Sequence, residues 1–177
     1  MLQIVWRVEA LALPALSLPC ARCARVSEFV CSERFRVNAN GGLLDVWLLY
    51  RCAACAALHK QRVERRVRAA ALPRERFAGY QGDAPALVRS IAFAAARGAA
   101  VPHRVLRPPL GVGALLARIE QPEPCGVRWH RLLARELGWS RARLEREAAL
   151  GGVRVNGGGA LKRTVADGDE LALSAPA

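Results

Sequence analysis

The sequence has no long apolar run and lacks the side-chain groupings that catalysis usually needs. No stretch reaches the roughly 18–20 apolar residues that a membrane-spanning helix requires. We find no Ser/His/Asp set, no carboxylate pair and no phosphate-binding glycine loop in the pattern. Internal repeats are missing as well. We therefore expect a protein that is not an enzyme and does not associate with a membrane.

The segment LALPALSLPCARC resembles an export signal only superficially. Glu9 interrupts the apolar stretch, and Pro19 stands where a small residue should precede a cleavage site. Cys20 belongs to a CxxC pair. We therefore expect a cytoplasmic protein, in which disulfides are disfavoured and paired thiols are better used as metal ligands.

Lysine is scarce and arginine is abundant. Lys60 and Lys162 are the only lysines among 27 Lys and Arg residues, and the net charge is +12. The excess is greatest in residues 56–120, which carry twelve Lys or Arg against four Asp or Glu. Such a surface attracts polyanions. RNA, DNA and an anionic membrane surface all fit, and charge alone does not choose among them.

Hydrophobic patterning predicts four strands and one helix before residue 100. The strands are expected at residues 2–13, 27–38, 43–51 and 57–72. In the last segment Val63 and Val67 fit a helix as well as one face of a strand, and a strand that loses its pattern near Ala69 is favoured. Asn40-Gly41-Gly42 is a tight-turn signal, because these residues tolerate positive φ. Asp83 is placed to cap a helix over residues 84–97 that ends at Gly98. The segment 121–124, rich in proline, is the candidate domain boundary.

Two CxxC pairs carry the strongest chemical signal. Cys20 and Cys23 form one pair and Cys52 and Cys55 the other, with 28 residues between the pairs. Each pair places two thiolates close enough to share one tetrahedral zinc ion, and the hairpin between them returns the chain to its start. This pattern predicts a zinc ribbon. Four thiolates leave no open position for an activated water, so the zinc is expected to be structural.

A metal-free pair of motifs and a redox site are the alternatives. A redox CxxC normally accompanies a βαβ pattern, which is missing here. His59, four residues after Cys55, is an alternative ligand. Cys31 is expected to be a small buried hydrophobe, and Cys125 has no expected role.

The C-terminal part of the chain predicts two short helices and then strands. The first helix, about 128–137, buries an apolar stripe and ends at Gly138. Ser140 is the expected N-cap of a second helix over about 141–149. A short strand and a small hairpin follow.

This order of residues resembles the S4 RNA-binding domain. The matching positions are Arg128, Ser140-Arg141, Gly151, Val153, Val155-Asn156-Gly157 and Gly168-Asp169. Trp129 replaces the usual Leu, and His130 replaces the usual Asp. The resemblance implies a basic face that docks on structured RNA through phosphate contacts. The implied contacts are Arg128, Arg131, Arg135, Ser140, Arg141, Arg143, Lys162 and Arg163.

A solvated helix surface is the alternative for each of these arginines. Arg141 with Glu145, and Arg143 with Glu147, have the spacing of ordinary intrahelical ion pairs.

The densest positive run lies between residues 60 and 76. Its members are Lys60, Arg62, Arg65, Arg66, Arg68, Arg74 and Arg76. The run either continues the RNA surface or forms a solvated strand edge that blocks aggregation. Aromatic platforms for single-stranded bases are not expected, because Trp6, Trp47 and Tyr50 fall in strands predicted to be buried.

The stretch CARCARVSEFVCSERFRVNANGGLLDVWLLYRCAAC resembles the uncharacterised bacterial family called domain of unknown function 1062. The shared features are the paired CxxC, the Phe-Arg-Val-Asn-Ala-Asn turn, the Asp-Val-Trp-Leu strand and a helix containing Ala92-Phe93. The resemblance is expected to run nearly end to end. It implies the architecture and carries no established activity.

Together these patterns predict an α+β fold. Residues 1–120 are expected to form a zinc-ribbon hairpin and a small antiparallel sheet with a packed helix, and residues 125–177 an S4-like α+β module. The expected function is non-catalytic binding of structured RNA, with ribosomal and transfer RNA as candidates. A zinc-stabilised adaptor that binds a protein partner without nucleic acid is the alternative. Only RNA binding predicts a steep loss of affinity as salt rises.

Overall fold

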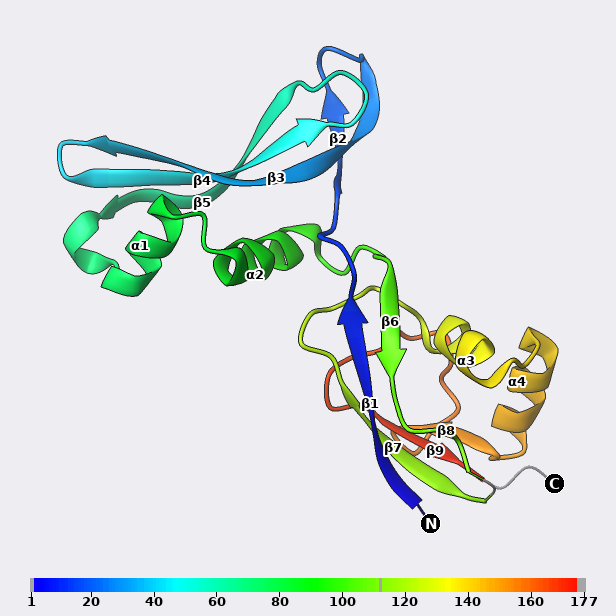
Figure 1. Ribbon diagram of the computed structural model, residues 1–177. Coiled ribbons are helices and arrows are strands. Elements are labelled where there is room, and N and C mark those ends of the chain that lie inside the picture. Colours follow the sequence, from blue (N-terminus) through cyan, green and yellow to red (C-terminus); the bar gives the residue numbers. More distant parts are fainter. Residues whose placement is uncertain (1, 112, 175–177) are drawn as a thin grey trace. The chain divides into compact units, whose positions relative to one another are not determined.

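The computed structural model describes residues 2–111 and 113–174 and divides the chain into two compact units (Figure 1). Residues 13–99 form one unit, here called the inserted unit. The chain before and after them forms the other, here called the terminal unit. Both units combine strands that pair mainly in antiparallel fashion with helices, which confirms the α+β class. Within the described residues, no helix has the length and apolar character needed to cross a membrane.

The inserted unit contains a four-stranded antiparallel sheet in the order β2-β3-β4-β5. Its strands are β2 (Leu16–Cys20), β3 (Arg25–Asn40), β4 (Leu43–Cys52) and β5 (Leu58–Arg68). Gly41 and Gly42 form the turn between β3 and β4 at φ values of 58° and 78°, which confirms the predicted tight turn. Alternate residues of β4 are fully buried, from Leu44 to Cys52.

The break that Glu33 makes in the apolar pattern of β3 is a real irregularity of the strand. Cys31 pairs with Tyr50 and Phe35 with Leu48, so four steps along β3 oppose two along β4. Glu33 has a φ of 57° inside this bulge. The extra residues let Cys31 and Phe35 keep the same face of the sheet despite the interruption.

Two helices cover one face of this sheet, α1 (Arg74–Gln81) and α2 (Pro85–Ala96) (Figure 1). Val88 and Ala92 of α2 belong to the same buried cluster as Leu48 and Tyr50 of β4. Helix α1 contributes Tyr80, whose ring meets that of Phe35 edge-on at a centroid distance of 5.1 Å. A short 3-10 turn over residues 69–71 joins β5 to the helices.

Asp83 does not cap α2, contrary to the sequence interpretation. The N-cap of α2 is Ala84, and Asp83 adopts a φ of 52° just before it. The Asp83 carboxylate instead accepts a hydrogen bond from the backbone N–H of Phe35 at 2.6 Å and one from Arg34 Nη1 at 2.7 Å. It therefore ties the helical segment to the bulge of β3, a partner that helix-capping rules cannot identify.

The terminal unit contains a five-stranded sheet in the order β6-β1-β7-β9-β8. Its strands are β1 (Leu2–Ala10), β6 (His103–Leu106), β7 (Leu115–Glu120), β8 (Val153–Val155) and β9 (Glu170–Leu173). Strands β1 and β7 are parallel, and the other neighbours are antiparallel. The helices α3 (Trp129–Leu137) and α4 (Arg141–Ala149) lie between β7 and β8 in sequence, as predicted.

This division differs from the expected domains at 1–120 and 125–177. Strand β1 pairs with β7, and β7 pairs with β9, so one sheet joins residues on both sides of the expected boundary at 121–124. Hydrophobic periodicity identifies a strand but does not say which strand lies beside it. The cysteine-containing segment is therefore inserted between β1 and β6.

Substituting Trp6 or Leu48 tests which strands depend on one another for their stability. Both side chains are fully buried, Trp6 in β1 and Leu48 in β4, and truncation of a buried Trp or Leu costs roughly 2–5 kcal/mol. Trp6→Ala should reduce hydrogen-exchange protection in β7 and β9, whereas Leu48→Ala should reduce it in β3 and β5. Mass spectrometry of exchanging peptides measures both. A Trp6→Ala effect confined to residues 13–99 would contradict the observed pairing.

Candidate functional site

Four cysteines converge at one end of the inserted unit. Cys20 ends β2 and Cys52 ends β4, while Cys23 and Cys55 lie in the turns that follow these strands. All four Sγ atoms lie within 4.8 Å of one another. The Cys20–Cys55 distance is 3.5 Å and the Cys23–Cys52 distance 3.8 Å. These separations exceed a disulfide bond of about 2.05 Å, and the thiols are free.

The sulfur spacing suits a tetrahedral metal ion. A metal–sulfur distance of about 2.3 Å places tetrahedral sulfurs about 3.8 Å apart, close to the two measured distances. The four cysteines can therefore hold one metal ion without another protein ligand. His59, the alternative ligand, is not part of the cluster and instead meets the ring of Phe29 edge-on at 5.6 Å.

Both cysteine turns reverse the chain in the same way. Ala24 follows Cys23 and Ala56 follows Cys55, and these alanines have φ values of 53° and 58°. The second turn is closed by a hydrogen bond from the Ala56 N–H to the Cys52 carbonyl at 2.9 Å. An L residue in this left-handed region costs about 1–2 kcal/mol. The sulfur cluster thus coincides with locally strained backbone in both turns.

The metal-free thiols have unequal pKa values. Burial raises the pKa of Cys52, but hydrogen bonds from the backbone N–H groups of Cys55 and Ala54 outweigh it and lower the pKa to about 6. The pKa of Cys23 is raised to about 12 by its hydrogen bond to Cys55, by burial and by the neighbouring thiols. A metal ion must displace the Cys23 proton, so metal affinity should fall as the pH falls.

Replacing one cluster cysteine tests the metal centre. Cys20→Ser should bind less metal than the wild-type chain, which should hold one ion, because a hydroxyl is a poorer ligand for a thiophilic ion. Elemental analysis of reduced, desalted protein measures the metal content. Cys31→Ser is the matched control, since the Cys31 Sγ lies outside the cluster and accepts from the Glu33 N–H at 3.4 Å. Equal metal content in the two variants would contradict the assignment.

A buried aspartate organises the loops of the terminal unit. Asp169 is 5% exposed. Its carboxylate accepts hydrogen bonds from Trp129 Nε1 at 3.1 Å, Asn156 Nδ2 at 2.7 Å and the Ala166 N–H at 3.0 Å. Arg163 Nη2 forms an ion pair with it at 3.1 Å. Four residues from three segments, with Arg163 and Ala166 in the same loop, therefore meet at one carboxylate.

This network gives a structural reason for several motif residues. Asn156 returns a second contact, because its Oδ1 accepts from the Glu170 N–H at 2.7 Å. Gly168, with a φ of 77°, turns the chain so that Asp169 points inward. The indole N–H of Trp129 donates to Asp169. S4 domains usually have a leucine where this chain has Trp129, and a leucine side chain could not make this contact.

Asp169→Asn should make the terminal unit less stable. Burial raises the pKa of Asp169, but the Asn156, Ala166 and Trp129 hydrogen bonds and the Arg163 charge lower it below its usual value. The ionised form is therefore favoured by folding, and this stabilisation is complete above about pH 5 and disappears as the pH falls through the folded-state pKa. We expect a loss of about 2–3 kcal/mol at pH 7. Urea unfolding between pH 3 and pH 7 measures it.

The control is Asp167→Asn, because Asp167 Oδ1 accepts from the Gln121 N–H at 2.7 Å, a bond that an amide oxygen can replace. The loss at pH 7 should be smaller. A loss in Asp169→Asn that stays constant down to pH 3 would contradict the electrostatic explanation.

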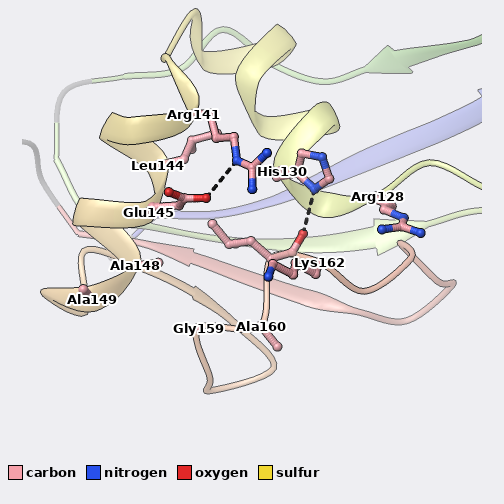
Figure 2. A pocket seen from close by; sticks show the side chains of 11 residues that line it. Arg128, His130, Arg141, Leu144, Glu145, Ala148, Ala149, Gly159, Ala160 and Lys162 are labelled. Carbon is pink, nitrogen blue, oxygen red and sulfur yellow. Dashed lines mark hydrogen bonds and ion pairs between the residues drawn. The ribbon is translucent and has the colours of Figure 1, made fainter.

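A groove of about 670 Å³ lies between α3, α4 and the loop before Lys162 (Figure 2). Ala148, Ala149 and Ala160 contribute accessible apolar surface to it, and the buried side chains of Leu144 and Leu161 lie beneath. The charged and titratable side chains along it are Arg128, His130, Arg141, Glu145 and Lys162. The His130 Nδ1 lies 3.3 Å from the Leu161 carbonyl oxygen, which links α3 to the loop.

Three of the eight predicted RNA contacts meet at this groove. Arg141 forms the expected ion pair with Glu145 at 2.8 Å. Arg128 and Lys162 form no ion pair with any residue in the described ranges. The groove therefore presents two cations that form no ion pair, although the charge of Lys162 helps to lower the pKa of Glu145 across the groove.

The other predicted contacts have different surroundings. Arg131 is exposed on α3, and Arg135 pairs with Glu136 at 3.0 Å. Arg143 does not pair with Glu147 but lies over the Trp139 ring at 4.2 Å. Ser140 caps α4 as predicted, accepting from the Arg143 N–H at 3.2 Å, while Arg163 pairs with Asp169. Sequence spacing locates these side chains on their elements but does not predict these tertiary partners.

The fold and the sulfur cluster define an α+β protein with a candidate metal centre. Residues 37–100 match a family described as "Protein of unknown function (DUF1062)". The match covers β4, β5, α1 and α2 with the second cysteine pair, and it supports the resemblance to this family without extending nearly end to end. No curated protein and no solved structure matches the chain.

Proposed function

We propose that the protein binds structured RNA through the groove between α3, α4 and Lys162, and that it is not an enzyme. The observation that carries this proposal is the position of Arg128 and Lys162. They come from separate segments, line one groove and form no ion pair within the described residues. Two cations that form no ion pair, beside an apolar surface, are suited to a phosphate backbone whose sugars or bases contact the protein.

The local chemistry supports phosphate recognition. The Arg128 guanidinium can donate two parallel hydrogen bonds to phosphate oxygens, and Lys162 adds a mobile point charge. Ala148, Ala149 and Ala160 supply accessible apolar surface on which a ribose or an unstacked base can pack. The helix–helix–strand order of α3, α4 and β8 agrees with the resemblance to S4 domains. Ribosomal and transfer RNA remain the candidate targets.

Zinc is the metal that we assign to the sulfur cluster. Soft thiolate ligands in tetrahedral arrangement suit zinc, and four of them complete its coordination shell. The ion would join the turn after β2 to the turn after β4 and so stabilise the inserted unit. A cytoplasmic location, where thiols stay reduced, is part of this proposal.

Arg128→Ala combined with Lys162→Ala tests the RNA groove. The double variant should bind an RNA hairpin about tenfold more weakly or worse, because charge-assisted contacts are lost. The slope of log affinity against log salt should become shallower by about 2, one for each lost phosphate contact. Fluorescence anisotropy of a labelled hairpin over a salt series measures both quantities.

Arg118→Ala combined with Arg154→Ala is the charge-matched control. These arginines lie on the sheet face opposite the buried residues of β7 and β8, and the groove's lining includes neither of them. The control should retain the hairpin affinity within a fewfold. Equal losses of hairpin affinity in both double variants would show that binding depends only on the overall positive charge, and would overturn the proposal. Salt-independent capture of a protein partner without hairpin binding would favour the adaptor function.

A further inference from the structure

The sheet of the inserted unit has a second face that its own helices do not cover. Along β4, Leu48 and Tyr50 point to the face that packs against α2, so Trp47, Leu49 and Arg51 point to the other. Both α1 and α2 lie on the first side (Figure 1). The second side is here called the open sheet face.

Trp47 is central on the open sheet face and has a cation on each side. Arg36 of β3 and Arg62 of β5 pair directly with Trp47 in the register of the sheet. Directly opposite side chains have Cβ atoms about 4.5–5.5 Å apart. Lys60 also approaches, with its Nζ 6.0 Å from the centroid of the Trp47 ring. One partly buried indole is thus surrounded by three positive groups.

The charge of this face is strongly unbalanced. Strand alternation and register give it five cations: Arg36, Arg51, Lys60, Arg62 and Arg68. None of the five forms an ion pair within residues 2–111 and 113–174. The acidic residues that the same register gives it are Glu28 and Asp45, and Asp45 Oδ1 already accepts from the Arg66 N–H at 3.2 Å.

Aliphatic side chains extend the surface beside the indole. Val30 is 53% exposed and Leu58 46% exposed, and they flank Arg51 in the register. Leu49 follows Trp47 on the same face of β4, opposite Lys60. The open sheet face therefore alternates apolar and cationic groups over three neighbouring strands.

We propose that the open sheet face binds single-stranded nucleic acid, with a base stacked on Trp47 and phosphates contacted by Arg36 and Arg62. A single strand exposes flat aromatic bases and one negative charge per nucleotide. An indole between guanidinium groups complements both, since stacking on aromatic side chains and a cationic surface are the two elements of sequence-tolerant strand binding. An acidic polypeptide matches the charge but offers no ring for the indole.

The expectation that stacking platforms are missing is revised by this proposal. It rested on treating residues 43–51 as buried on both faces, because nearly all of them are apolar. The structure fully buries only alternate residues, and Trp47 and Leu49 remain partly accessible. The inference is independent of the proposed hairpin groove, because it concerns other residues, in the other unit, and an unpaired form of nucleic acid.

The test uses the full chain, an oligouridylate and an oligodeoxythymidylate of about ten nucleotides. Trp47→Leu keeps an apolar side chain but removes the indole. It should weaken oligonucleotide binding roughly 5- to 100-fold, the effect of losing one stacked base, whereas Trp47→Phe should retain most of the affinity. Arg36→Ala with Arg62→Ala should make the salt slope shallower by about 1.4. Comparing the two oligonucleotides shows whether the ribose hydroxyl contributes.

The following controls make the outcome decisive. Circular dichroism and metal content should match the wild-type protein in each variant. Trp47→Leu should leave RNA hairpin affinity unchanged, and Arg128→Ala with Lys162→Ala should leave oligonucleotide affinity unchanged, so either proposal can fail alone. Equal binding of oligonucleotides by wild type and Trp47→Leu would overturn stacking. Polyglutamate that competes as well as oligouridylate would overturn the choice of nucleic acid and indicate an acidic protein partner.

Discussion

The convergence of four sulfurs is the constraint on which the arrangement of the inserted unit depends. Cys20 and Cys23 belong to the β2–β3 turn, and Cys52 and Cys55 to the β4–β5 turn. The hairpin between the two cysteine pairs spans 28 residues, and a shared ion would fix both pairs at one end of the sheet. Cys20 and Cys52 also belong to the buried cluster that includes Leu48 and Val88, so the sulfur end of the sheet is continuous with the core beneath α2. Register along β4 in turn decides which side chains face those helices and which remain on the open sheet face.

The predictable part of this structure is the part encoded locally. The CxxC pairs, the Gly41-Gly42 turn, the break at Glu33 and the cap at Ser140 all appear where the sequence places them. Each depends on residues close together in the chain or on a geometry that one residue type favours. To predict the sulfur cluster, one needs beyond the CxxC spacing only a hairpin that brings the two pairs together, and a hairpin is itself a local structure.

The unpredicted part depends on partners distant in sequence. Nothing in residues 2–10 indicates that they pair in parallel with β7, more than one hundred residues later. Asp83 has the sequence context of a helix cap, yet it binds the β3 backbone. The partners of charged side chains are equally hard to predict. Arg143 lies over the Trp139 ring instead of pairing with Glu147, whereas Arg128 lines the groove, and only the three-dimensional structure distinguishes the two arginines. Composition located the basic character of the chain, but it could not separate neutralised cations from available ones.

The insertion of residues 13–99 between β1 and β6 also has a consequence for synthesis on the ribosome. Strand β1 is translated before the inserted unit, but its neighbours β6 and β7 emerge only after the whole of it. The inserted unit can complete its hairpins from nearby residues while β1, with its apolar Trp6, still lacks hydrogen-bonding partners. Closing so long a loop is slow and leaves an unpaired strand exposed in the meantime. Residues 2–10 therefore find their native neighbours only after the inserted unit has been made.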